Sequence, residues 1–269
     1  MKIIYLVVYL LYLKIGFLIN NFLKKKKIKK NKKNYNLIKD FKKKGYLVIE
    51  NFISEENCNL LIKKIDKFYK INPNFIYEDK AGAEIRIFGA QRLGGDFKSY
   101  FSNNFIKQLG SEIYGGQLGN LMNMSNRIFA KNGNQGSGSG WHRDALNFQY
   151  KSILYLNKTH GANGPFQIIK DSEKNINIIK DTFKYSLSIK NNRFSDNQIQ
   201  KIIKNEPDRL KTFKGKTGTL LIVNTSFIHR GKPLSSGVRY AMTNYYYPKH
   251  KVNIMKNYFK PFLNNNYDL

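Results

Sequence analysis

The pattern of hydrophobic and polar positions predicts helices at the start of the chain. Residues 3–23 are almost continuously apolar, and as a helix they would extend roughly 31 Å at about 1.5 Å per residue. Residues 35–44 predict a short basic helix, and residues 45–52 alternate as a strand does. Ser54 is a suitable N-cap for a further helix, whose apolar residues recur at helical spacing to about Tyr69.

After residue 75 the pattern changes to short apolar runs separated by Gly, Asn, Ser and Pro, which predict strands of a double-layered β core. The predicted strands are 84–91, 126–131, 152–157, 164–170, 218–224 and 239–247. Residues 175–212 lack this pattern and predict an insertion, with a helix from Ser195 to Lys204. Insertions of this kind often shape a substrate pocket.

These patterns divide the chain into an N-terminal segment, 1–34, a main domain, 35–260, and a tail, 261–269. The apolar run of the N-terminal segment is compatible with a single membrane span, although Lys14 lies near its middle. The alternatives are a helix that lies in the membrane interface and a start codon that was assigned too far upstream. The lysines that follow residue 23 would keep the main domain cytoplasmic, anchored or not, under the positive-inside rule.

The composition limits which residues could bind a metal, but it does not identify a binding partner. The net charge of +29 includes +13 from residues 1–44, and the remaining charge is scattered. Codon bias on a solvated surface explains this distribution better than nucleic-acid binding does, so nucleic acid is not expected as a partner. Because Cys58 is the only cysteine, disulfides within the chain and Cys-rich zinc sites are excluded, and a metal would need His and carboxylate ligands.

Three residues of these two ligand types occur in a suggestive arrangement. His142 and Asp144 are two residues apart, so in an extended segment both side chains point to the same face. Such pairs are common by chance, but His229 directly follows the apolar run 219–228 and could return beside them on a strand. Two imidazoles and one carboxylate form the facial triad that binds Fe(II) and leaves coordination positions open.

An arginine ten residues after the second histidine extends this hypothesis. The segment from Pro233 to Gly237 allows a turn, which would place Arg239 on a strand beside the one before His229, facing the metal. A guanidinium can hold a carboxylate through two parallel hydrogen bonds. This geometry predicts 2-oxoglutarate as co-substrate, with its distal carboxylate on Arg239.

Together the segments WHRD (141–144), SILYLN (152–157), NGPFQII (163–169) and KTGTLLIVNTSFIHRG (216–231), followed by Arg239, resemble the phytanoyl-CoA dioxygenase family. The opening segment 45–66 also resembles the family's entry of strand and helix. The resemblance implies a mainly β fold with flanking helices (α+β), a double-stranded β-helix or cupin-like jelly-roll barrel. It also implies Fe(II), 2-oxoglutarate and dioxygen as cofactor and co-substrates.

Further 2-oxoglutarate contacts are expected on the strand before the glycine-rich loop 133–140, and the candidates are Asn123, Ser125 and Arg127. Halogenating relatives have a small residue at the position of Asp144, so the resemblance implies hydroxylation of a small organic substrate with release of succinate and CO2. The chain departs from the family's usual pattern at 170–174, where KDSEK replaces Pro-Gly-Ser-His-Lys, and at Arg143. Neither departure removes an expected iron ligand.

Other residues carry weaker hypotheses. Arg86 and Arg92 could face substrate, although arginines beside strands are more often exposed. Trp141 could wall the metal pocket or fill the core, and surface positions are expected for the other two histidines, His160 and His250. The alternative to an enzyme is a catalytically inactive barrel that serves as a membrane-tethered binding module, but the intact set of ligands disfavours it.

Overall fold

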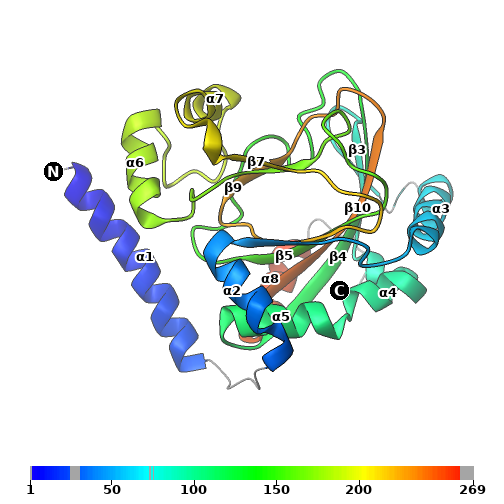
Figure 1. The fold of residues 1–269 in the computed structure, drawn as a ribbon, viewed down its shortest axis with the longest axis horizontal. Coiled ribbons are helices and arrows are strands. Elements are labelled where there is room, and N and C mark those ends of the chain that lie inside the picture. The colour runs from blue at the N-terminus through cyan, green and yellow to red at the C-terminus, as the bar shows by residue number, and fades with distance from the viewer. Residues whose placement is uncertain (1, 25–30, 73, 75, 261–269) are drawn as a thin grey trace.

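The protein, seen in a computed structural model that describes residues 2–24, 31–72, 74 and 76–260, is built around two antiparallel sheets (Figure 1). The larger sheet has the order β1-β8-β5-β10-β4-β3-β2, and the smaller has the order β7-β6-β9. The strands of the larger sheet are β1 Tyr46–Ile49, β2 Tyr77–Glu78, β3 Glu84–Phe88, β4 Leu118–Phe129, β5 Tyr150–Tyr155, β8 Leu220–Asn224 and β10 Val238–Pro248. The strands of the smaller are β6 Phe166–Ile169, β7 Leu210–Phe213 and β9 Ile228–Gly231. The double-layered, mainly β fold predicted from the sequence is confirmed.

Helices cover the outer face of the larger sheet and flank the smaller one (Figure 1). Those packed with the larger sheet are α2 Tyr35–Lys44, α3 Glu55–Ile71, α4 Gly95–Phe101, α5 Asn104–Tyr114 and α8 Val252–Phe259. The two beside the smaller sheet are α6 Asn175–Tyr185 and α7 Asp196–Asn205. Short 3-10 turns are η1 Lys32–Asn34, η3 Ala90–Leu93, η4 Pro207–Arg209 and η5 Lys249–Lys251.

Strand β8 shows why the polar alternation typical of an exposed sheet is missing from its sequence. Leu221 and Val223 face the smaller sheet, while Leu220 and Ile222 pack beneath the helices on the other face. Both sides of the strand are therefore buried, and both need apolar residues. The same two layers give neighbouring positions on β5 and β10 opposite surroundings.

The predicted helical segments agree closely with the structure. The helix over 35–44 is α2, and Gly45 ends it in the left-handed conformation with φ 77°. Helix α3 begins after Ser54, whose side chain accepts a hydrogen bond from Asn57 N. Helix α7 begins after Ser195 with a capping box.

Two parts of the fold differ from the expectation. Helices α4 and α5 lie between the predicted strands 84–91 and 126–131, where no element was predicted, and their residues Phe97, Tyr100, Ile106 and Leu109 are buried at spacings that suit helices. Strand β7 begins at residue 210, within the predicted insertion, and pairs with β6 at the edge of the smaller sheet. The inserted segment thus ends before residue 210.

The apolar N-terminal run forms helix α1, Lys2–Lys24, at the side of the molecule along α6 (Figure 1). Leu6 and Leu10 pack against Ile178 of α6, and Lys14 Nζ donates a hydrogen bond of 2.8 Å to the carbonyl oxygen of Leu146. In the part of the chain that the structure describes, no helix combines the length and apolar content that crossing a membrane requires. Membrane association stays a prediction, and the predicted tail 261–269 lies outside the described residues.

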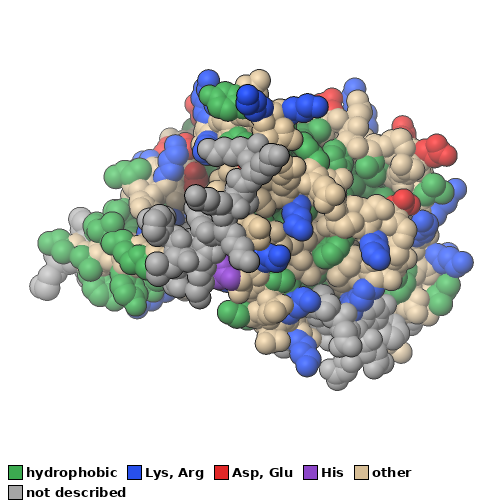
Figure 2. All heavy atoms as spheres, turned by 90° about the horizontal axis from the view of Figure 1, so that it is seen from below, with side chains coloured by type: hydrophobic (Ala, Val, Ile, Leu, Met, Phe, Trp, Pro, Cys, Tyr) green, Lys and Arg blue, Asp and Glu red, His purple; other side chains and the backbone are tan. Residues whose placement is uncertain are grey.

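Positive charge is dispersed on the face of the molecule that Figure 2 shows. On the face seen in Figure 2, the Lys and Arg side chains are dispersed among polar and apolar neighbours and do not gather into one stripe. A scattered distribution was expected from the sequence for the chain after residue 44.

We expect Gly218→Ala to destabilise the protein by more than about 2 kcal/mol, because a left-handed backbone and a steric clash would combine there. Gly218 has φ +76°, and a Cβ added to it would lie 2.1 Å from the carbonyl oxygen of Ile53. Gly161→Ala is the matched control, since its nearest contact would be the Lys214 side chain at 4.0 Å. Denaturant unfolding of both variants tests this, and equal stability would contradict it.

Candidate active site

His142 and Asp144 lie on a short extended segment, 141–144. In space, this segment lies between strand β9 and the insertion. His142 N donates to His229 O at 2.9 Å, and His229 N donates to His142 O at 2.7 Å. On the side away from β9, the backbone of His142 forms an antiparallel β-bridge with Arg193, and Arg143 N donates to Asn192 O at 2.7 Å. The segment is therefore held from both sides, and its pairing with β9 brings the two histidines side by side.

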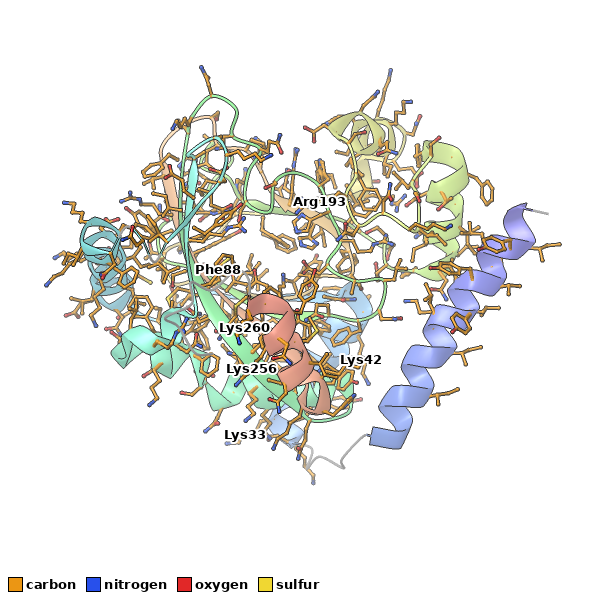
Figure 3. The ribbon with its side chains drawn as sticks, turned by 180° about the vertical axis from the view of Figure 1, so that it is seen from behind. Lys33, Lys42, Phe88, Arg193, Lys256 and Lys260 are labelled. Carbon is orange, nitrogen blue, oxygen red and sulfur yellow. The ribbon has the colours of Figure 1, made fainter. Side chains whose placement is uncertain are left out.

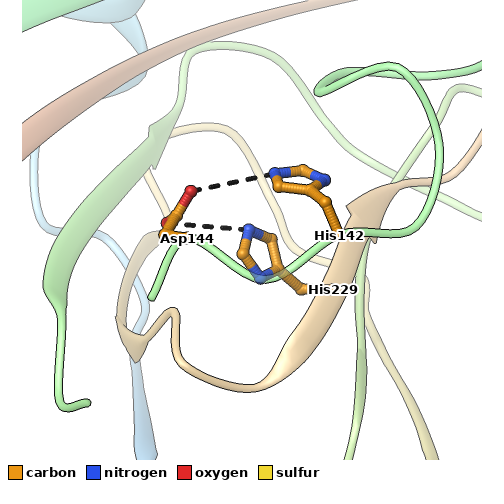
Figure 4. Close-up of side chains that lie close together, drawn as sticks. All are labelled: His142, Asp144 and His229. Carbon is orange, nitrogen blue, oxygen red and sulfur yellow. Dashed lines mark ion pairs between the residues drawn. The ribbon is translucent and has the colours of Figure 1, made fainter. Parts of the chain in front are cut away.

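The three side chains converge, as the sequence predicts (Figure 4). Their ligand atoms all lie within 4.8 Å of one another. Asp144 Oδ1 is 3.9 Å from His142 Nε2, and Asp144 Oδ2 is 3.8 Å from His229 Nε2. Such a cluster of two imidazoles and one carboxylate can hold one divalent metal ion.

Backbone carbonyls orient both imidazoles. His142 Nδ1 lies 2.9 Å from Gly140 O, and His229 Nδ1 lies 2.8 Å from Phe227 O. Since a carbonyl only accepts, each Nδ1 carries the proton and each Nε2 presents its lone pair toward Asp144. This arrangement around the ring nitrogens is typical of metal-binding histidines.

The electrostatics of the cluster favour the forms that bind metal. Burial lowers the pKa of His229 to about 3, and burial also lowers the pKa of His142 below its ordinary value. Burial alone would raise the pKa of Asp144, but Lys151 and the two histidines hold it well below its usual range. At neutral pH the site therefore holds two neutral imidazoles and an ionised carboxylate.

Lys151 is a member of the site that the sequence did not reveal. It is buried on β5, its Nζ lies 2.7 Å from Asp144 Oδ2, and it lies 4.1 Å from the centroid of the Tyr245 ring. Burial works against its charge, yet Asp144 raises the pKa of Lys151 above the ordinary value. The signal in the sequence was a lysine within the largely apolar run 150–156.

Arg239 lies on β10, in the same cavity as the three ligands. Its side chain is buried and donates a short hydrogen bond to Gly164 O. Its Nε is buried without a hydrogen-bond partner among the described residues. A buried donor of this kind is costly unless a ligand accepts from it, so the arrangement suits a bound carboxylate.

The other predicted 2-oxoglutarate contacts lie on the opposite face of β4, and the structure does not bring them to the cavity. Asn123 bonds to Asn244 at 2.9 Å, and Ser125 donates to Asn123. Arg127 pairs with Asp66 at 2.6 Å on the outer side of the sheet. Because side chains alternate along a strand, the neighbouring residues Met124 and Asn126 line the cavity instead.

A cavity of about 660 Å³ contains the three candidate ligands and Arg239. Alternate residues of β5 and β10 form one wall, because 151, 153 and 155 on β5 and the odd-numbered positions from 239 to 247 on β10 face it. Arg193, from the insertion, and Phe88, at the end of β3, lie on separate parts of its lining (Figure 3). The insertion thus contributes to the cavity, as expected.

Of the residues with weaker hypotheses, some line the cavity and others do not. Arg86 lines the cavity, whereas the Arg92 guanidinium donates to the carbonyls of Gly89 and Phe88. Trp141 is a core residue beside Arg230, whose guanidinium lies 4.3 Å from the ring centroid. His160 and His250 are both exposed and outside the cavity.

The sequence profile of the phytanoyl-CoA dioxygenase family matches residues 41–241. The chain belongs to the phytanoyl-CoA dioxygenase family. The matched range includes all three candidate ligands and Arg239, so the family suggested by the sequence motifs is confirmed. No curated protein sequence matches the chain.

Solved structures with low sequence identity share the fold. EctD from S. alaskensis with bound Fe has a TM-score of 0.60 and 14% identity, covering 82% of this chain and 80% of EctD. The non-heme alpha ketoglutarate dependent epimerase SnoN from nogalamycin biosynthesis has a TM-score of 0.56 and 13% identity, with coverages of 79% and 81%. HygX from Streptomyces hygroscopicus with nickel and 2-oxoglutarate bound has a TM-score of 0.53 and 11% identity, with coverages of 82% and 88%. These similarities establish the cupin-like jelly-roll fold for a member of this family.

We expect the metal-free protein to lose stability as pH falls from about 6.5 toward about 3. His229 has its pKa lowered from 6.5 to about 3 in the folded protein, so across this window the unfolded chain binds the proton and the folded chain does not. Above about pH 6.5, His229 is largely neutral in both the folded and the unfolded chain, so its protonation does not reduce the stability there. Urea unfolding at a series of pH values measures the effect.

His229→Gln should flatten this pH dependence, while the exposed control His160→Gln should keep it. An unchanged slope in His229→Gln would contradict the expectation.

Proposed function

We propose that this protein is a non-haem Fe(II)- and 2-oxoglutarate-dependent dioxygenase that hydroxylates a small organic substrate, with release of succinate and CO2. The convergence of His142, Asp144 and His229 in one cavity with a buried arginine carries the proposal. In this proposal the three residues hold Fe(II), and Arg239 binds the distal carboxylate of 2-oxoglutarate. When bound, the metal and 2-oxoglutarate supply the activation of dioxygen.

The protein's residues prepare the site for this chemistry. The carbonyls of Gly140 and Phe227 fix the tautomers of both histidines, so the Nε2 atoms are ready to bind metal without rearrangement. Phe166, whose ring centroid is 5.3 Å from that of His229, and Ile153 present apolar surface to the cavity, which disfavours water there. The reaction is thereby directed to substrate rather than to solvent.

The presence of a carboxylate at position 144 supports hydroxylation. Its charge and position suit metal binding, and with a metal bound an aspartate there would take the place that a halide would need in a halogenating enzyme. The same cluster disfavours an inactive binding module, because the three candidate ligands are intact and converge, and backbone carbonyls hold both imidazoles. The fold neighbours described as an epimerase and a carbocyclase show that this fold also serves other outcomes.

Anaerobic addition of Fe(II) and 2-oxoglutarate should produce a weak metal-to-ligand charge-transfer absorption band. His142→Ala should abolish the band, because it removes one of the ligands, and the exposed control His160→Ala should retain it. Absence of the band from the folded wild-type protein would refute the proposed function.

Arg239→Met should weaken 2-oxoglutarate binding by about 30-fold to 100-fold, the scale of a lost charge-assisted pair. Titration of the same absorption band with 2-oxoglutarate measures this. Arg127→Met is the matched control, because Arg127 contacts Asp66 on the opposite side of the sheet and should leave the affinity close to that of wild type. Equal losses in both variants would show that the effect is structural.

A further inference from the structure

The cavity is strongly asymmetric in charge. Among the described residues that line it, Asp144 is the only acidic one. The basic residues of the lining are Arg86, Arg143, Lys151, Arg193, Arg239 and Lys251. The cavity thus presents positive charge to whatever enters it.

Two of these cations are already engaged within the protein. Arg86 pairs with the buried carboxylate of Glu84, which also accepts hydrogen bonds from Asn126 and Ser137 at 2.7 Å. The Arg143 guanidinium donates to Ser172 O at 2.8 Å and lies 5.8 Å from the Phe194 ring centroid. Each guanidinium thus has a partner within the protein, although the Nε atoms of both are buried without a hydrogen-bond partner among the described residues.

Lys151 is in a different position, because its one carboxylate partner among the described residues is a metal ligand. On β5 the side chains of 151, 153 and 155 face the cavity, whereas Tyr150 and Leu154 face the helices. The ammonium group is therefore fixed at the cavity wall, 2.7 Å from Asp144 Oδ2. In the protein without metal, this ion pair neutralises both groups.

Metal binding changes that balance. In the proposed function, the charges of Fe(II) and Arg239 together equal those of Asp144 and the two carboxylates of 2-oxoglutarate. Lys151 is then left as a buried cation whose former counter-charge is committed to the metal. A buried cation whose counter-charge is shared with a metal is unfavourable, so a further anion beside Lys151 would stabilise it.

We propose that the substrate is an anion, carrying a carboxylate or a phosphate group, and that Lys151 binds this group beside the metal. The inference rests on the proposed function and adds the substrate's chemical class. Tyr245 and Tyr247, which line the same wall, provide an apolar surface for the body of the substrate. Arg193, exposed on the insertion with its guanidinium donating to Gly138 O at 2.8 Å, adds positive charge that attracts the anion to the cavity.

The experiment uses the full-length protein, loaded anaerobically with Fe(II) and 2-oxoglutarate until the charge-transfer band is complete. Calorimetric titration then compares each acid with its neutral amide: hexanoate with hexanamide, and 3-phenylpropionate with 3-phenylpropanamide. Phenyl phosphate beside phenol separates phosphate from carboxylate as the preferred group. At least one anion should bind about tenfold or more tightly than its neutral partner, the scale of one charge-assisted hydrogen bond.

Lys151→Met should reduce this preference to near one, and Lys151→Arg should retain most of it. The matched control Lys158→Met removes the same charge from an exposed position outside the cavity and should behave as wild type. In the metal-free protein the preference should also be lost, because Asp144 then occupies Lys151.

The proposal is overturned if no anion binds more tightly than its neutral partner, including the case in which no probe binds. It is also overturned if Lys151→Met leaves the preference intact, or if this variant weakens 2-oxoglutarate binding by a larger factor than it changes the preference. That last outcome would assign Lys151 to the co-substrate. A missing charge-transfer band in wild type would instead refute the proposed function, so the two failures are distinguishable.

Discussion

The reciprocal backbone pairing of His142 with His229 is the interaction on which the site depends. The two hydrogen bonds, of 2.9 and 2.7 Å, join residues that are far apart in the chain and determine how closely the two imidazoles approach. The same segment is held on its other side by the insertion, through the contact between Arg143 N and Asn192 O. A metal site built on paired backbone is rigid, which suits a metal that must keep open positions in a defined geometry.

Alternation of side chains along the strands separates the cavity from the core. On β5, β10 and β4, one set of residues faces the space between the sheets and the other packs against helices or forms polar contacts on the outer side. The cavity-facing set is chemically varied, while much of the outward set of β5 and β8 is apolar. Residues that line the cavity and residues that stabilise the core therefore alternate along the same strands.

Charge links the metal site to the rest of the cavity. Asp144 is shared between the two histidines and Lys151, so its carboxylate is the point at which metal binding and the positive lining meet. Glu84, which does not itself line the cavity, neutralises Arg86 of the lining in a comparable way. The difference is that Glu84 remains with its partner, whereas Asp144 is available to a metal.

The sequence alone predicted the fold class, the family, the three candidate metal ligands and Arg239 as a cavity residue, because these depend on local periodicity and on sequence motifs. It also located α2, α3 and α7, whose caps are local signals. It was wrong about the neighbours of the strand that carries Arg239, since β10 pairs with β5 and β4 and not with β8, the strand before His229. Only the tertiary structure decided which face of β4 meets the cavity. Successive side chains of a strand point to opposite faces, so the sequence did not tell whether Asn123, Ser125 and Arg127 or their neighbours would face the cavity. The tertiary structure also revealed the contact between Lys151 and Asp144, because the pairing of β5 with its neighbours and the path of the 141–144 segment together bring the two side chains within 2.7 Å.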